Sequence, residues 1–386
     1  MRIAPRALLC GSVFRVGGRP EDTGFEELRE LTNAAGDKRS LALGMMGHLT
    51  TLTFNSHYRE AAVMASEFAT LVESIGDPAM TVGLFYAAAQ AKWEAGEATE
   101  SLRLAQLIID LADGDPTMGD FVIGSPLAWA LTVKGAAGMF LGRQGWRDDL
   151  EAGIAMGRSV DPNTQPFVQL YKYQAAVQNG AVLPTAQDVA VAARSLETAQ
   201  RSGNNIAVAY ALMNRATTLI HNASEDTAAG VEFLAKAKEM FADQQLTLTL
   251  RRMSNIEFAR ERARSGDFAG AIELATTVLT RQFDTGETVF RGPATTVLVE
   301  ALLSRGSATD IADAERAIDR LAAVPIEPGF VPHELPLLRL RALLARARGI
   351  ESGEAGYQQF LQRFRAKAQA ADFEGYLAQA DAMAGS

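Results

Sequence analysis

The sequence predicts an all-α protein, a superhelical solenoid of about eight helix-turn-helix repeats. Two observations lead to this expectation. Apolar residues recur with the 3.6-residue period of amphipathic helices along the 386-residue chain, and long alternating β-branched segments are missing. The helices also come in pairs, and the second helix of each pair begins at a nearly constant spacing. A chain with this pattern is expected to be an elongated array.

The start of each second helix carries a turn residue, then an aromatic residue or alanine, then an apolar helix. Gly96-Glu97-Ala98 and Gly145-Trp146-Arg147 are examples. The marked positions are 58, 98, 147, 187, 227, 268 and 309, so the steps are 40, 49, 40, 40, 41 and 41 residues. A weaker copy starts near Ser352. We expect the array to span residues 23–386, with a period of about 40 residues.

Residues 1–22 are expected to form an N-terminal helix or leader outside the array. The first eleven residues briefly resemble an export signal. However, Pro5 and Arg6 interrupt the apolar run, and Leu9 is not the small residue that processing before Cys10 requires. We therefore interpret this segment as a helix. Further along, Pro78 and Pro162 mark helix ends, because proline cannot continue the preceding helix.

The single 49-residue step contains a glycine-rich stretch, which we interpret as a loop insertion at residues 113–126. Gly114 and Gly119 have the spacing of a phosphate-binding loop, but Asp120 stands where that loop needs lysine, and a helix precedes it. The acidic residues also lack the glycine and glutamate of a calcium loop. We expect a long connection with Phe121, Val122 and Ile123 packed onto neighbouring helices. The residues that define it are Gly114, Pro116, Gly119, Phe121 and Gly124.

Composition limits the partners and the compartment. The formal net charge of −9 argues against direct binding of nucleic acid, although ordinary solubility explains an acidic balance equally well. No apolar run reaches the roughly 20 residues of a membrane span. One cysteine permits no internal disulfide, so we expect a reducing, cytoplasmic setting. The four histidines lack metal-ligand spacing, and we expect no metal and no cofactor.

Helical arrays usually bind partners along the concave face, which the first helix of each pair lines. Polar residues recur there at steps of 40, 41 and 41 residues, and could bond the backbone of an extended peptide; hydrogen bonding between helices is the alternative. A basic-aromatic patch near Tyr171 and Arg252 has a solvated helix face as its alternative. We expect a protein or peptide partner at this set: Tyr171, Gln174, Asn214, Arg215, Arg252, Asn255 and Thr296.

Two resemblances extend this interpretation. The segment Gly266–Leu274 closely matches the start of the second helix of a tetratricopeptide repeat, which implies a right-handed superhelix. In addition, the chain resembles, over roughly residues 20–386, the C-terminal repeat region of large mycobacterial proteins. In those proteins a class III adenylate/guanylate cyclase domain precedes an AAA-type signal-transduction ATPase module and the repeats. The matching strings are Ser74–Pro78, Asp110–Thr117, Ile123–Ala128, Gly145–Arg147, Phe290–Thr296 and Asp372–Tyr376.

The resemblance implies a regulatory role and no catalysis. The metal-binding aspartates of the cyclase belong to a β-rich domain that does not match this chain, and the ATPase phosphate loop does not match it either. We therefore expect a non-enzymatic scaffold or sensor region, with a cyclase–ATPase module as one implied partner. The alternative is a truncated remnant, related to an adenylate cyclase or an ATP-binding transcriptional regulator, without a partner of its own.

Overall fold

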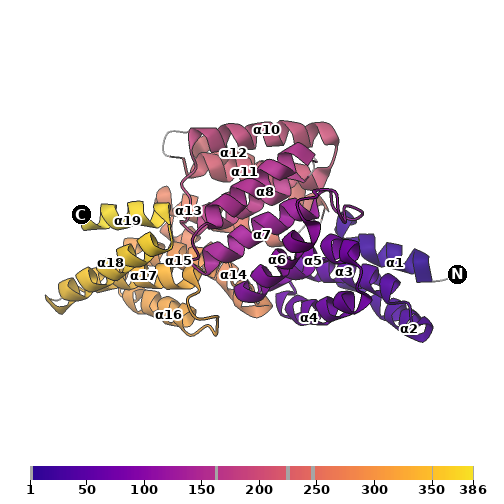
Figure 1. Cartoon of the computed structure of the whole chain (residues 1–386). Helices are drawn as coiled ribbons and strands as arrows, with labels where there is room; N and C mark the ends of the chain where they lie inside the picture. The colour runs from indigo at the N-terminus through magenta and orange to yellow at the C-terminus, as the bar shows by residue number, and fades with distance from the viewer. Residues whose placement is uncertain (1–2, 161–163, 223–226, 245–247, 350, 386) are drawn as a thin grey trace.

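The computed structural model describes residues 3–160, 164–222, 227–244, 248–349 and 351–385. Within these residues the chain is all-α, as expected, and contains no strand (Figure 1). Short helical turns η1 (Val13–Val16) and η2 (Pro20–Thr23) follow the first helix, and a π-helical turn η3 (Tyr171–Ala176) extends α9. The α-helices are α1 (Ile3–Ser12), α2 (Phe25–Ala35), α3 (Lys38–Phe54), α4 (Tyr58–Ile75), α5 (Pro78–Glu94), α6 (Ala98–Ala112), α7 (Pro126–Phe140), α8 (Trp146–Val160), α9 (Gln165–Leu170), α10 (Ala186–Ser202), α11 (Asn205–Ile220), α12 (Thr227–Gln244), α13 (Leu248–Arg264), α14 (Phe268–Thr285), α15 (Arg291–Arg305), α16 (Asp310–Ala322), α17 (Val331–Ala347), α18 (Glu351–Ala370) and α19 (Glu374–Ala384).

The second helices begin where the repeated spacing places them. Their first residues are at 58, 98, 146, 186, 227, 268 and 310, each within one residue of the expected position. The turn before α14 shows why the local signal is reliable. Gly266 has φ +86°, a left-handed conformation that ends α13, and the Asp267 carboxylate accepts a hydrogen bond from the Gly270 N–H. Both features were expected from these residue types.

The first helices of successive pairs pack on one another. Helices α3, α5 and α7 are in contact in that order, as are α11, α13, α15 and α17, and η3 lies between α7 and α11. Helix α5 is surrounded by α3, α4, α6 and α7, and every residue from Met80 to Glu94 is buried. Its sequence has no polar face, which is the pattern of a helix enclosed on all sides.

The C-terminal third of the chain returns onto turns of the N-terminal half. The N–H and hydroxyl of Thr288 both donate to the Glu94 carbonyl, 194 residues away in sequence. The Trp146 indole N–H donates to the Ala371 carbonyl at 3.1 Å, and the Tyr376 N–H donates to the Gly180 carbonyl at 3.0 Å. Figure 1 shows the arrangement: α17 lies beside α7 and α15 beside α14, while the two ends of the chain lie on opposite sides of the molecule.

The N-terminal segment packs against the array. Helix α1 contacts α3, and Cys10 is fully buried there with its thiol donating to the Gly44 carbonyl at 3.0 Å. Burial raises the pKa of this thiol to about 12, so Cys10 stays a neutral, packed side chain. Among the described residues, no helix combines the length and the apolar character that crossing a membrane requires.

Candidate functional site

Two members of the expected polar set hydrogen-bond between helices. The side chains of Gln174 and Asn214 are fully buried. The Gln174 amide donates to the Thr217 hydroxyl at 2.9 Å, and the Asn214 amide donates to the Pro166 carbonyl at 2.8 Å. These contacts join η3 and α9 to α11, which is the second of the two interpretations that the sequence left open. The two amides face other helices and not an open groove.

The rest of the set lies in separate places. Tyr171 is buried, and its ring meets Trp93 edge-on at 5.1 Å. Arg215 donates to the Val189 carbonyl at 2.7 Å. Asn255 is half-buried on α13, and Thr296 is half-buried on α15, where its hydroxyl donates to the Gly292 carbonyl. The side chain of Arg252 lies outside the described residues. The structure therefore does not gather the described members of this set into one surface.

The basic-aromatic patch is also absent in the described residues. Tyr173 is buried beside Tyr171 on η3, and Lys172 forms ion pairs with Glu151 and, at 2.6 Å, with Asp188. Burial opposes the charge on Lys172, but hydrogen bonds to these carboxylates raise its pKa overall. Lys172 is thus held by its acidic neighbours and is not presented to a partner.

The insertion at 113–126 packs in part as expected. Its first residues form a tight turn, in which the Asp115 carboxylate accepts hydrogen bonds from the N–H and the hydroxyl of Thr117. Val122 and Ile123 pack against the hydrophobic core. The expectation for Phe121 needs correction, because its side chain is 52% exposed. The Phe121 ring lies close to Gly83 of α5, but about half of the residue remains exposed.

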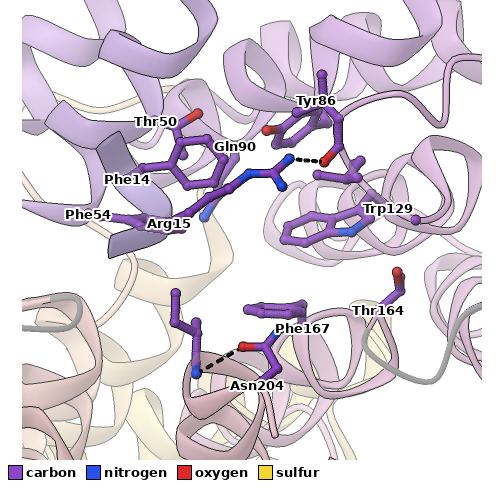
Figure 2. A pocket seen from close by; sticks show the side chains of 14 residues that line it. Phe14, Arg15, Thr50, Phe54, Tyr86, Gln90, Trp129, Thr164, Phe167 and Asn204 are labelled. Atoms are coloured by element: carbon purple, nitrogen blue, oxygen red, sulfur yellow. Dashed lines mark hydrogen bonds between the residues drawn. The ribbon is translucent and has the colours of Figure 1, made fainter. Parts of the chain in front are cut away.

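One of several cavities in the described structure is lined by part of this insertion. Its volume is about 290 Å³. Figure 2 shows that the N-terminal turn η1, the insertion and the first helices α3, α5, α7 and α9 all contribute side chains to it. The lining residues are Phe14, Arg15, Thr50, Phe54, Tyr86, Gln90, Val122, Ile123, Gly124, Trp129, Thr164, Phe167, Asn204 and Ile206. We call this cavity the aromatic pocket.

Five of the fourteen lining residues are aromatic. Tyr86, Trp129 and Phe167 come from three successive first helices, and their ring centroids lie 5.7 and 5.9 Å apart in order. Tyr210 of α11 continues the series at 4.6 Å from Phe167. Phe14 meets Phe54 edge-on across the wall, at 6.0 Å. Rings at these separations attract one another.

Arg15 lines the aromatic pocket. Its guanidinium donates a 2.5 Å hydrogen bond to the Val122 carbonyl, which joins the N-terminal turn to the insertion (Figure 2). A second contact fixes this turn: the Asn55 amide at the end of α3 donates to the Gly18 carbonyl at 3.0 Å. This side of the pocket is therefore built from two segments that lie 107 residues apart in sequence.

One polar side chain inside the aromatic pocket has no partner. Gln90 is only 6% exposed, and its amide lines the cavity without a hydrogen bond to any described residue. The other polar groups there are occupied: the Thr50 hydroxyl donates to the Met46 carbonyl, and the Asn204 side chain caps α11. Burial raises the pKa of Tyr86 to about 12, so its hydroxyl remains neutral. The Gln90 amide lines the cavity, so a ligand or water there can pair with it.

The histidines take part in packing. His221 lies 3.1 Å from both oxygens of the Glu257 carboxylate, and Arg260 lies 2.6 Å from one of them. Burial alone would raise the pKa of Glu257, but the charges of Arg260 and His221 outweigh it and hold that pKa well below its usual range. Among the described residues, no group of histidine, cysteine and acidic side chains is arranged to hold a metal ion.

Comparison with protein-family models finds no match for this chain, and comparison with curated proteins finds none either. The description of the candidate site therefore rests on the geometry of this chain alone.

Sequence reasoning missed the aromatic series, although a signal for it was present. Tyr86, Trp129, Phe167 and Tyr210 recur at steps of 43, 38 and 43 residues, close to the repeat period. We followed the polar series at 174, 214, 255 and 296 instead, because polar groups on a concave face indicate peptide binding. Gln90, Phe14 and Arg15 carried no signal, since only the folded chain brings them to the same cavity.

Proposed function

We propose that this chain is a non-catalytic helical-repeat scaffold that binds a small effector. Its architecture is a right-handed superhelical solenoid of tetratricopeptide-like helix pairs. The near-constant spacing of the second helices supports this, as does the succession of contacts between first helices. The return of the C-terminal helices onto N-terminal turns supports a superhelix, because a flat array would not bring residues 94 and 288 together.

The effector that the aromatic pocket fits best is a planar heteroaromatic molecule of one or two fused rings. The unpaired Gln90 amide at an aromatic wall is the observation that carries this proposal. The rings offer stacking surfaces, and Gln90 offers one donor and one acceptor to the edge of a flat polar ring. A volume of about 290 Å³ lies at the small end of ligand pockets, which limits the size of the occupant.

Arg15 couples ligand binding in the aromatic pocket to the N-terminal turn and the insertion. A ligand that enters has to displace Arg15 from Val122 or stack beneath it, so binding acts on the N-terminal turn and on the insertion together. In the cyclase–ATPase proteins that the chain resembles, such a change would reach the ATPase module. We accordingly propose a cytoplasmic sensor region for which that module is one partner.

A thermal-shift screen of purine, indole and quinoline compounds tests this function. Compounds that bind the folded chain raise its Tm by mass action, and stacking on Trp129 changes the tryptophan emission. We expect hits that do both. A library that leaves Tm and emission unchanged would contradict the effector role. Formation of cyclic AMP from ATP with Mg²⁺ or Mn²⁺ would contradict the non-catalytic part.

A further inference from the structure

A second cavity lies where six elements converge. It has a volume of about 190 Å³ and is bounded by α11, α13, α15, α17, α19 and the turn after η3. Arg260 and Arg264 of α13 and Arg339 of α17 reach it from two helices. We call it the arginine pocket. It continues into a wider groove of about 670 Å³ that shares these three arginines and adds Arg346.

Positive charge is in excess among the side chains that line the arginine pocket. Glu300 is the one carboxylate among its lining residues, and it pairs with Arg339. The buried Glu257 behind the wall pairs with Arg260 and His221. Arg264 reaches only Glu261, at 3.4 Å on the same helix. This concentration of arginine is unusual in a chain whose formal net charge is −9.

Several polar atoms at this pocket lack partners among the described residues. Arg339 is 12% exposed, and its Nε and one terminal nitrogen make no hydrogen bond. Gln178 is 4% exposed, and its side-chain oxygen makes none, but this oxygen is an acceptor that an anion does not satisfy. A buried guanidinium that is only partly paired is costly, because desolvation is not repaid by hydrogen bonds. A bound anion would lower this cost for the guanidinium groups that it contacts.

We propose that the arginine pocket binds the phosphate group of a small molecule. Each planar guanidinium fork matches two oxygens of an oxyanion. One carboxylate offers two oxygens, which a single arginine satisfies, whereas a phosphate monoester offers three oxygens and up to two charges. Three arginines from two helices therefore suit phosphate better. The site is separate from the aromatic pocket, and the proposal stands whether or not that pocket binds an effector.

Calorimetry on the full chain with inorganic pyrophosphate, and with citrate as a carboxylate probe, tests the proposal. The informative variant is Arg264→Gln, because Arg264 lines the pocket but is 42% exposed and carries little of the fold. The matched control is Arg262→Gln, which removes the same charge from the same helix at a side chain that is 51% exposed and outside the pocket. A third variant, Glu300→Gln, removes the competing carboxylate.

We expect pyrophosphate to bind the unaltered chain with a Kd below about 1 mM at low salt. Arg264→Gln should weaken binding about tenfold, Arg262→Gln should leave it within about twofold, and Glu300→Gln should tighten it. Equal losses in the two arginine variants would overturn the proposal, since they would indicate general surface attraction. Tighter binding of citrate than of pyrophosphate would overturn the assignment to phosphate, as would the absence of binding.

Discussion

At the scale of single residues, His333 makes the stability of the fold depend on pH. It is 3% exposed on α17, and its Nε2 lies 3.0 Å from the Thr288 carbonyl, close to the point where the C-terminal third meets Glu94. Burial, with a smaller contribution from the nearby charge of Arg291, outweighs the hydrogen bond to Thr288 and lowers the pKa of His333 to about 4. The neutral ring therefore belongs to the folded state.

The direction in which stability changes with pH follows from the number of protons that the unfolded and the folded chain bind. The unfolded histidine has a pKa near 6.5, so between about pH 6.5 and 4 the unfolded chain binds more protons than the folded one. Stability is fully present above pH 6.5 and falls as the pH drops to 4, by up to about 3 kcal/mol from this group.

The substitution His333→Gln should flatten this part of the pH dependence, because glutamine keeps a donor for the Thr288 carbonyl without titrating. Urea unfolding at pH 7 and pH 4.5 measures it. Carboxylates titrate equally in both proteins and cancel in the comparison. The control His57→Gln alters a half-exposed histidine and should retain the original dependence. A His333→Gln protein that loses as much stability as the unaltered chain would show that His333 is not responsible.

At the scale of elements, the insertion depends on a close approach of two backbones. A Cβ added to Gly83 of α5 would lie 2.5 Å from the Gly119 carbonyl oxygen and 2.6 Å from the Phe121 ring. Gly83→Ala should therefore push the insertion away from α5 and cost about 1–3 kcal/mol. Limited proteolysis should then cleave within residues 113–124 of an otherwise folded chain.

The same substitution at Gly356 provides the control for this prediction. There an added Cβ would meet only the Ala345 side chain at 3.7 Å, so Gly356→Ala should be neutral or slightly stabilising. Equal protease resistance of the insertion in the Gly83→Ala and Gly356→Ala proteins would mean that the close approach at Gly83 does not hold the loop.

The starts and ends of the helices could be predicted from the sequence better than the aromatic pocket could. Caps such as Asp267 and stops such as Pro78 act through neighbouring backbone groups, so their signals are local and the helix starts followed from them. The π-helical turn at Tyr171–Ala176 was not expected, because no local motif marks it. The site combines Arg15, Gln90 and Val122 from three distant segments, and only tertiary packing brings these together. For the same reason, each ring of the aromatic series looked like an ordinary core residue.

At the scale of the whole molecule, Arg147 connects the two parts of the chain. Its guanidinium pairs with the Asp372 carboxylate at 2.6 Å and donates to the carbonyls of Ala181 and Asp372, both at 2.8 Å. The side chain is 29% exposed, and it also covers the Trp146 ring at 4.4 Å. These contacts hold the start of α19 against the turn after η3.

Arg147→Ala should lower the free energy of unfolding by about 1–3 kcal/mol, since several charge-assisted hydrogen bonds disappear together. Hydrogen–deuterium exchange should rise in α19 while α3 to α6 stay protected. The control Arg143→Ala removes an exposed arginine from the preceding turn and should change neither quantity. Unchanged exchange in α19 of the Arg147→Ala protein would indicate that other contacts close the molecule.

The proposed effector binds in the aromatic pocket through Gln90. Calorimetric titration of the best compound from the screen into three proteins tests this binding: the unaltered chain, Gln90→Met and Gln106→Met. Gln106 is a partly exposed residue of α6 whose amide reaches Asp110 on the same helix and which lies outside the aromatic pocket, so its replacement is a matched control. We predict about tenfold weaker binding for Gln90→Met and unchanged binding for Gln106→Met. Equal affinity in all three proteins would contradict the claim.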